Sequence, residues 1–439
     1  MTGAGIALGV YRGIARIGAP LVARHLDRRR RQGREHDSRW PERLGHAGLP
    51  RPDGRLIWLH GASVGESLSL LPLIDRLRAA MSSPAVHFLV TTGTVTSARL
   101  MADRLGPGAL HQFAPVDTPQ AVDRFLTHWR PDAALFVESE IWPNLLDGLD
   151  RRQIPRALVN ARMSATSARR WVAMPGLARR LIGGFRPLLA QDDDSAARFQ
   201  AVLGRPVAAP GNLKDAAEPL PADPVVLDAL VAAIAGRPVW LAASTHPGEE
   251  ALVLAAALRL RAAYPDLLTV IVPRHPERGA AIAAEAEAAG FTVTRRATSA
   301  LPDAATDLYL ADTLGELGVF FRAIAITFIG GSLVPVGGHN LLEPARLGAA
   351  ILTGPHLGNF ASLAARFRTA GAMLVVADAA GLADAVARLL ADPAARNDLA
   401  AAAGSVAAEG SAGLARIVAA VLPLVDPATA APAASGEVS

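Results

Sequence analysis

Two glutamates stand where they could carry acid–base chemistry. Glu66 follows the predicted strand 55–60, in the segment GASVGE, and falls in the first turn of the next predicted helix; Glu138 ends the predicted strand 134–138. Polar residues after parallel strands meet at one edge of the sheet, so we expect both carboxylates there. Two carboxylates in unlike environments can divide into a base and a supporting partner. Residue type alone leaves a hydrolase, a metal site or simple stabilisation of the helix start open.

Lys214 is the only lysine among the 44 basic residues of the chain. One lysine kept among so many arginines indicates a position that needs a compact ammonium, because the guanidinium is bulkier and planar. We expect it to stabilise negative charge on a leaving phosphate or on a substrate carboxylate. Chance retention is the alternative. The residue lies in a Pro-rich stretch, 211–224, that predicts an interdomain linker.

A basic pair follows the predicted strand 267–273. Arg274 offers a bidentate guanidinium and His275 an imidazole, and both groups suit a phosphate. His275 could instead occupy a capped turn. The loop DTLGEL at 312–317, with Gly315 and Glu316, is a further candidate at the end of another predicted strand.

The segment GGSLVPVGGHNLLEP at 330–344 combines a strand end, a glycine loop and a helix start. We expect Gly337 and Gly338 to let backbone N–H groups approach an anion where Asn340 opens a helix. A carboxylate there would repel phosphate, so Glu343 should face hydroxyl groups, most simply those of a ribose. An ordinary helix start is the alternative.

These residues need a scaffold of parallel strands, and the sequence alternates short β-rich runs with helical stretches of about 10–20 residues. The first series of predicted strands covers 55–60, 86–92, 134–138, 156–161 and 187–191. The alternation stops at the linker and restarts with predicted strands at 239–244, 267–273, 307–312, 325–331, 349–354 and 373–378. This pattern predicts two doubly wound α/β domains with a cleft between them. Residues 426–439 read as a disordered tail.

The N-terminal segment predicts an amphipathic helix, with Ile6, Val10, Ile14, Ile17 and Leu21 on one side and Arg12 and Arg16 on the other. The arginines interrupt the apolar stretch, so a membrane span is not expected. The helix and the following arginine run suit an anionic membrane surface instead. A helix packed on its own domain is the alternative. The charge follows the apolar stretch, unlike a cleaved signal peptide, so we expect the body to stay in the cytoplasm.

Composition excludes several classes. The absence of cysteine rules out disulfides, thiolate metal sites and a cysteine nucleophile, so any metal would need His and carboxylate ligands. Residues 1–50 carry a net charge of +6 and the remaining chain −2, so the basicity belongs to the N-terminus. With aromatics at 5% and no basic stripe in the bulk of the chain, nucleic-acid binding is not expected.

Over roughly residues 6–425 the chain resembles the Kdo transferases of lipopolysaccharide assembly. The motifs that carry the resemblance occur in this order: HGASVGE, PVDTP, VESEIWPN, NARMS, GNLK, ASTHPGEE, PRHPER, DTLGEL and GGSLVPVGGHNLLEP. The resemblance implies an α/β fold of the GT-B class, two Rossmann-like domains facing across a cleft, with an N-terminal amphipathic membrane-associating helix. It implies an inverting enzyme that moves 3-deoxy-D-manno-octulosonic acid (Kdo) from CMP-Kdo to a lipid A precursor, lipid IVA, at the cytoplasmic face of the inner membrane, without a cofactor or metal.

The implied organisation is a membrane-associating segment 1–35, an acceptor-binding domain 36–210, the linker 211–224, a CMP-Kdo-binding domain 225–425 and the tail 426–439. By motif, Glu66 is the proton acceptor, and Glu138 and Lys214 assist at the transition state. The implied nucleotide contacts are Pro273, Arg274, Leu314, Gly315, Glu316, Asn340, Leu341, Leu342 and Glu343. The chain departs from its relatives after GNLK, where Asp215 and Ala216 replace the usual Phe-Asp, and at Leu314, where Met is common.

Two other readings remain open. One is a transferase or epimerase of similar architecture that acts on a UDP-sugar, because glycine loops do not distinguish CMP from UDP. The other is a catalytically inactive protein that binds a lipid or nucleotide at the membrane.

Overall fold

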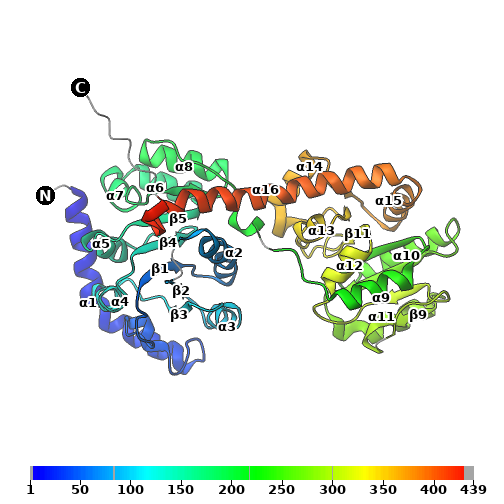
Figure 1. The fold of residues 1–439 in the computed structure, drawn as a ribbon, viewed down its shortest axis with the longest axis horizontal. Coiled ribbons are helices and arrows are strands. Elements are labelled where there is room, and N and C mark those ends of the chain that lie inside the picture. Colours follow the sequence, from blue (N-terminus) through cyan, green and yellow to red (C-terminus); the bar gives the residue numbers. More distant parts are fainter. Residues whose placement is uncertain (1–2, 83–84, 217, 299, 430–439) are drawn as a thin grey trace. The chain divides into compact units, whose positions relative to one another are not determined.

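The computed structural model describes residues 3–82, 85–216, 218–298 and 300–429. The chain divides into two compact units, one formed by Met1–Ala217 with Gly410–Ser439 and the other by Glu218–Glu409. The sequence-based boundary of the second domain was 425, so residues 410–425 belong to a different unit from the one expected. Each unit is a parallel sheet covered by helices on both faces (Figure 1).

The first unit has six parallel strands in the order β3-β2-β1-β4-β5-β6. Their bounds are β1 Arg55–His60, β2 Val86–Thr92, β3 Ala109–Phe113, β4 Ala133–Val137, β5 Arg156–Ala161 and β6 Leu188–Ala190. The chain leaves the sheet centre after β1 on one side and returns at β4 on the other. The carboxyl ends of these two neighbours form the topological switch point, where doubly wound sheets bind ligands.

The helices of the first unit separate into two layers with distinct cores. One core joins alternate strand residues such as Ile57 to apolar side chains of α2 and to Ile417 of α16; the other joins Trp58 to α4, α5 and α7. The helical segments are α1 Gly3–Arg31, α2 Val64–Ala80, α3 Val95–Arg104, α4 Pro119–Trp129, α5 Pro143–Arg151, α6 Ala165–Val172, α7 Pro175–Leu181 and α8 Asp193–Leu203, with 3-10 turns Trp40–Leu44 and Leu213–Ala216.

The second unit has seven parallel strands in the order β13-β12-β11-β7-β8-β10-β9. Their bounds are β7 Val239–Thr245, β8 Leu268–Pro273, β9 Val293–Arg295, β10 Leu308–Leu310, β11 Ile326–Ile329, β12 Ala350–Thr353 and β13 Leu374–Val375. The switch point lies between β7 and β11. The helices are α9 Pro224–Ile234, α10 Glu249–Arg261, α11 Gly279–Ala288, α12 Leu317–Ala323, α13 Leu342–Arg346, α14 Ala361–Thr369 and α15 Ala379–Ala391, with 3-10 turns Pro276–Arg278, Arg296–Thr298 and Gly358–Phe360.

The long helix α16, Pro393–Val425, contributes residues to both units. Among the described residues, it and Ala4–Arg31 are the two helices that are long and apolar enough, by length and composition alone, to cross a membrane. Apolar residues of α16 pack in a core of each unit. This packing accounts for the apolar composition of the helix.

The predicted tail at 426–439 is ordered where it is described. A 3-10 turn spans Pro427–Thr429, and Asp426 accepts a hydrogen bond of 2.8 Å from the Ser82 backbone N–H. Residues 430–439 lie outside the described residues.

Candidate active site

The switch point of the first unit brings Glu66 and Glu138 to neighbouring strand ends. Glu66 lies in the first turn of α2, directly after β1, and Glu138 directly follows β4. Residues of β1 and β4 pair in register, His60 opposite Phe136. Two carboxylates from separate motifs therefore share the sheet edge at which this class of fold binds its ligands.

Glu138 holds an unusual backbone conformation and an ion pair. Its φ of 62° lies in the left-handed region, which costs a residue with a β carbon about 1–3 kcal/mol and is often found at functional sites. Its carboxylate Oε1 lies 2.5 Å from the Nζ of Lys214. The Lys214 side chain is half exposed, so the pair borders solvent and can meet a ligand.

A second contact fixes the 3-10 turn that carries Lys214. Asn160, the last but one residue of β5 and also at positive φ, accepts a hydrogen bond of 2.9 Å from the Leu213 backbone N–H. The Nζ of Lys214 lies 3.9 Å from the point where a β carbon on Gly65 would stand. The ammonium is thus held between Glu138 and the first turn of α2, the turn that also carries Glu66.

Glu66 is also the closing residue of a capping box. Ser63 is the N-cap of α2 and accepts from the Glu66 N–H, while the Glu66 carboxylate accepts from the Ala62 N–H at 2.8 Å and from the Ser63 hydroxyl at 2.7 Å. Glu66 therefore stabilises the start of α2, which is the structural alternative that its first-turn position allows. A carboxylate has about four lone-pair sites, so two hydrogen bonds do not exhaust its capacity to accept a proton.

His60 and Glu140 form a polar link beside these glutamates that the sequence did not reveal. The buried His60 ring donates through Nε2 to Glu140 at 3.2 Å and accepts at Nδ1 from the Thr91 hydroxyl at 2.9 Å, and Trp142 also donates to Glu140. Burial acts to raise the pKa of Glu140, but the hydrogen bonds from His60 and Trp142 and the attraction to His60 outweigh it and lower that pKa. Glu140 is therefore a stable anion at neutral pH.

A cavity of about 340 Å³ opens at this edge. Its walls combine aromatic rings with polar groups from several loops: Arg43, Trp58, His60, Ala62, Gly93, Thr94, Ala114, Pro115, Val116, Asp117, Trp142 and Leu145. Ala62, one of these wall residues, donates its backbone N–H to the Glu66 carboxylate. Aromatic faces with a few convergent polar groups are typical of a small-ligand site, and the volume suits one or two sugar rings.

Asp117, at one wall of the cavity, ties the N-terminal helix to α5. Its carboxylate accepts from the backbone N–H groups of Asn144 and Leu145 and, at 3.0 Å, from the Tyr11 hydroxyl of α1. Burial raises the pKa of Asp117, and burial next to Asp117 raises that of Tyr11 to about 12. The Tyr11–Asp117 hydrogen bond anchors the helix beside the cavity.

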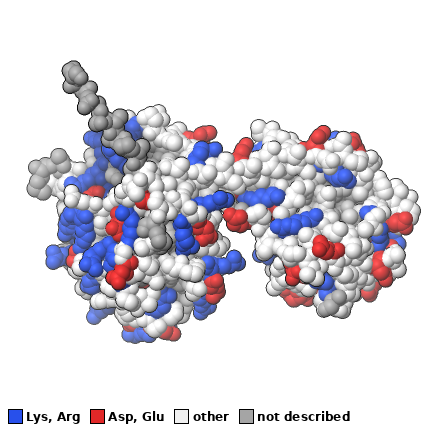
Figure 2. Space-filling model, in the orientation of Figure 1, with Lys and Arg blue, Asp and Glu red and all other residues white. Residues whose placement is uncertain are grey.

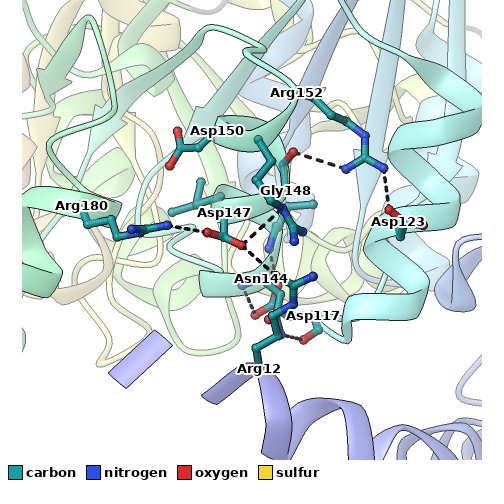
Figure 3. Close-up of polar contacts among 12 residues, drawn as sticks. Arg12, Asp117, Asp123, Asn144, Asp147, Gly148, Asp150, Arg152 and Arg180 are labelled. Carbon is teal, nitrogen blue, oxygen red and sulfur yellow. Dashed lines mark hydrogen bonds and ion pairs between the residues drawn. The ribbon is translucent and has the colours of Figure 1, made fainter. Parts of the chain in front are cut away.

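An ion-pair cluster around Asp147 provides the second anchor (Figure 3). Arg12 of α1 and Arg180 of α7 approach this buried carboxylate at 3.6 Å and 2.9 Å, and Arg152 pairs with Asp123 at 2.6 Å on the neighbouring helix. Arg12, predicted to lie opposite the apolar side of α1, thus faces the protein.

The apolar side of α1 faces solvent. The five residues of the predicted arc, Ile6, Val10, Ile14, Ile17 and Leu21, are all exposed, Ile17 to 83%, whereas Leu8 and Leu26 are buried. The end of the helix forms a basic hollow of about 400 Å³ lined by His25, Arg28, Arg29, Gln32 and Arg34. Lys and Arg side chains are prominent on the viewed face of this unit (Figure 2). An exposed apolar stripe that ends in a basic cluster is typical of a helix that lies in a membrane interface.

In the second unit, the expected nucleotide residues follow three strands that end at the same carboxyl edge, with β7 between β11 and β8. Arg274 follows β8, the loop with Glu316 follows β10, and the segment with Asn340 follows β11. Within the described chain, the exposed Arg274 guanidinium makes no hydrogen bond or ion pair, although it is close enough to act electrostatically on Glu343. A free guanidinium at this edge is suited to a phosphate.

The helix near Asn340 and Glu343 starts two residues later than expected. The helix α13 begins at Leu342, and the Asn340 side chain accepts from the Leu342 N–H at 3.1 Å and donates to Glu343 at 3.2 Å. Burial raises the pKa of Glu343, against the opposing effects of Asn340, Arg346 and Arg274.

The expectation that Gly337 and Gly338 offer their N–H groups to an anion is wrong. Both are at positive φ, as glycine permits, but both N–H groups donate to the Gly331 carbonyl, at 3.2 and 2.7 Å. The two glycines therefore close the loop on itself, and Asn359 and Leu357 fill the space that side chains would need.

The remaining expected contacts are mixed in character. Leu341 and Leu342 are core residues, so any nucleotide contact there would be through backbone, whereas Leu314 is 80% exposed. Glu316 is held by a bidentate interaction with Arg296, which lowers the pKa of its carboxyl. His275 is exposed and makes no side-chain cap, with its Nδ1 3.4 Å from Glu277. Among the described residues, no group of three or more His, Asp or Glu could hold a metal ion.

Comparison with known proteins agrees with this geometry. Residues 38–217 match the family model described as 3-deoxy-D-manno-octulosonic-acid transferase (kdotransferase). The chain is 37% identical over 396 residues to a probable mitochondrial 3-deoxy-D-manno-octulosonic acid transferase of Arabidopsis thaliana, covering 88% of both chains. It is 36% identical over 397 residues to the 3-deoxy-D-manno-octulosonic acid transferase of Bordetella pertussis, covering 88% of this chain and 92% of that one.

The solved glycosyltransferase of Rickettsia africae superimposes with a TM-score of 0.53 at 10% identity, covering 85% of this chain and 99% of that one. Such a likeness shows the fold alone, here the GT-B arrangement of two doubly wound units. The relatives of similar sequence decide the family. The chain belongs to the 3-deoxy-D-manno-octulosonic acid (Kdo) transferases.

Proposed function

We propose that this Kdo transferase takes Kdo from CMP-Kdo and attaches it to the lipid A precursor lipid IVA with inversion at the anomeric carbon. The observation that carries the proposal is the Lys214–Glu138 ion pair beside the turn that holds Glu66. It places a compact cation and two carboxylates at the switch point of a chain that belongs to the Kdo transferases.

The reaction is a single displacement. A hydroxyl of the acceptor sugar gives its proton to the Glu66 carboxylate, and its oxygen forms a bond to the anomeric carbon of Kdo. The bond between that carbon and the phosphate oxygen breaks, and the electron pair leaves with CMP. One displacement at one carbon inverts its configuration. Lys214 and Glu138 act on the charges that develop during transfer.

The acceptor fits the cavity of the first unit. Trp142, which is 42% exposed, offers its ring to a sugar, and Arg43 offers a polar contact. The exposed stripe of α1, anchored through Tyr11 and Arg12 beside this cavity, is suited to a lipid whose acyl chains stay in the bilayer. We place the enzyme on the cytoplasmic face of the inner membrane, held to anionic lipid.

The donor fits the carboxyl edge of the second unit. The Arg274 guanidinium is available for the phosphate, and Glu343 with Asn340 is suited to the ribose hydroxyls. Pro273, Leu314, Gly315 and Glu316 complete the proposed nucleotide contacts, with Leu341 and Leu342 acting through backbone.

Calorimetric titration of the purified protein with CMP and with UDP tests the donor. Tighter binding of CMP is expected. A preference for UDP would replace this proposal by a UDP-sugar enzyme, and binding of CMP without any transfer to lipid IVA would indicate a binding protein.

A further inference from the structure

His246 and His339 form a head-to-head pair at the switch point of the second unit. His246 follows β7, and His339 ends the loop that follows β11, the strand next to β7. Their Nε2 atoms are 2.9 Å apart, and their rings are within 14° of parallel with centroids 5.1 Å apart. The pair thus lies edge to edge in nearly one plane, joined by a nitrogen–nitrogen hydrogen bond.

This geometry fixes the number of protons in the contact. One Nε2 must carry a hydrogen and the other a lone pair, because two N–H groups or two lone pairs at 2.9 Å would repel. The pair can exist as two neutral rings or, with one more proton on an Nδ1, as a cation that keeps the same bond. It can therefore gain one positive charge without rearrangement.

A buried carboxylate holds the two loops together. Glu249, at the start of α10, accepts from four backbone N–H groups, those of His246, Gly331, Ser332 and Leu333, at 2.6–3.0 Å. Gly331 is at a φ of 67°, and a β carbon there would stand 3.1 Å from the His339 ring and 3.4 Å from the His246 ring. The close approach of both rings to backbone explains why a glycine is needed at this position.

The charged groups around the pair leave it neutral in the free protein. Burial, His246 and Arg274 lower the pKa of His339 to about 4. Burial, His275 and Arg274 lower that of His246, against Glu249 and Glu250, which act to raise it. Both rings are only partly buried, and the His275 ring packs edge-on against His246. The site therefore borders solvent, and among the described residues it includes the exposed guanidinium of Arg274.

We infer that His246 and His339 bind the carboxylate of Kdo, the second anion of the donor, and that the pair takes up one proton as it does so. The inference rests on the proposed donor, CMP-Kdo, which carries a phosphate on the nucleotide and a carboxylate on the acid. One free guanidinium pairs well with one anion. The second anion needs a second cation, and the pair supplies it from a solvent proton only when the anion is present.

Calorimetry of the full-length protein without acceptor tests the inference. CMP-Kdo and CMP are titrated near pH 7.5 in buffers with different ionisation enthalpies, so that the heat reports protons taken up. We expect CMP-Kdo to take up close to one proton more than CMP does, and its affinity to rise as the pH falls from 8 to 6.

Three variants separate recognition from structure. His246→Gln and His339→Gln keep a polar group of similar reach but cannot become cations. Each should weaken CMP-Kdo binding at least about tenfold and remove the extra proton uptake, while CMP affinity stays within about twofold, which also reports an intact fold. His356→Gln, which changes an exposed histidine of the same unit, should behave like the natural protein.

Equal proton uptake for the two ligands, or full CMP-Kdo affinity in His339→Gln, would overturn this inference alone. Equal loss of CMP and CMP-Kdo affinity would overturn it too, because the pair would then serve the phosphate or the fold. Failure of the natural protein to bind either ligand would overturn the donor assignment together with it.

Discussion

The Nζ of Lys214 lies 2.5 Å from Oε1 of Glu138, and the two residues are 76 positions apart in the chain. Exposed ion pairs contribute only about 0–1 kcal/mol to stability, while the positive φ of Glu138 costs about as much or more. The pair is therefore poorly explained as a stabilising feature. We propose instead that the ion pair keeps the Lys214 ammonium in place for a ligand.

Replacing Lys214 by alanine should cut turnover about 100-fold or more, because the cation that meets developing negative charge is lost. The free energy of unfolding should change by less than about 1 kcal/mol, since the side chain is half exposed. Lys214→Arg should rescue little, because a planar guanidinium cannot reproduce the compact ammonium that pairs with Glu138. Steady-state kinetics and urea unfolding measure both quantities.

The control for that experiment is Arg198→Ala, which removes an exposed ion pair with Asp194 on α8 of the same unit. It should leave turnover unchanged. Nearly natural turnover in Lys214→Ala would show that the ammonium has no part in transfer.

The two roles of Glu66 can be separated by a matched pair of variants. Glu66→Gln keeps an oxygen to accept the Ala62 N–H, so stability should stay near natural, but it cannot take a proton and turnover should fall about 100-fold to 10,000-fold. Glu66→Ala should lose the same activity and also about 1 kcal/mol of stability with the capping box. An active Glu66→Gln enzyme would mean that Glu66 is only a cap.

The exposed stripe of α1 should bind membranes. Ile17→Asp, which places a charge on the most exposed of its five residues, should reduce co-sedimentation with phosphatidylglycerol vesicles severalfold without altering the folded body. Val225→Asp changes a similarly exposed apolar residue of the second unit (77%) and should bind like the natural protein. Unchanged sedimentation of Ile17→Asp would show that the stripe does not contact lipid.

His111 should make stability depend on pH. Burial and the Arg39 charge lower its pKa to about 3, because Nδ1 accepts from Arg39 at 3.0 Å and Nε2 meets Thr92. The folded state resists protonation of His111. The stability that the neutral ring contributes is therefore complete above pH about 6.5. It is lost as the pH falls from 6.5 toward 3, by up to about 1.4 kcal/mol per pH unit. Urea unfolding at pH 7.5 and 5 should show a larger acid loss in the natural protein than in His111→Gln. Equal losses would contradict the assignment.

The strands that define the two sheets could be read from their runs of β-branched and apolar residues, but two were missed. β3, ALHQF, has no β-branched residue, and β9, VTR, has only three residues. Both are parallel strands whose pairing depends on neighbours in the sheet rather than on local preference. The return of residues 410–425 to the first unit also depends on packing, because nothing local distinguishes the two parts of one long helix.

The candidate site, like the fold, could be predicted only in part from the sequence. Glu66, Glu138 and Arg274 could be singled out because Glu138 and Arg274 directly follow strands and Glu66 lies in the first helical turn after one. The contacts that position the site could not be predicted, because they join residues far apart in the chain. Asn160 holds the turn that carries Lys214 across 53 residues, and Glu249 holds the 331–333 loop across more than 80. The prediction that Gly337 and Gly338 bind an anion was wrong. Their N–H groups donate to the Gly331 carbonyl instead, and a glycine-rich sequence does not distinguish these two partners.

Mass spectrometry of the acceptor tests the central claim most directly. The natural protein and Glu66→Gln are incubated in parallel with CMP-Kdo and lipid IVA, and released CMP is measured beside the lipid mass. The natural protein should add one or more Kdo residues with an equal amount of CMP released, and Glu66→Gln should add almost none in the same time. A lipid of unchanged mass with the natural protein, under conditions where it binds CMP-Kdo, would contradict the assignment of this chain as the enzyme that transfers Kdo to the lipid A precursor.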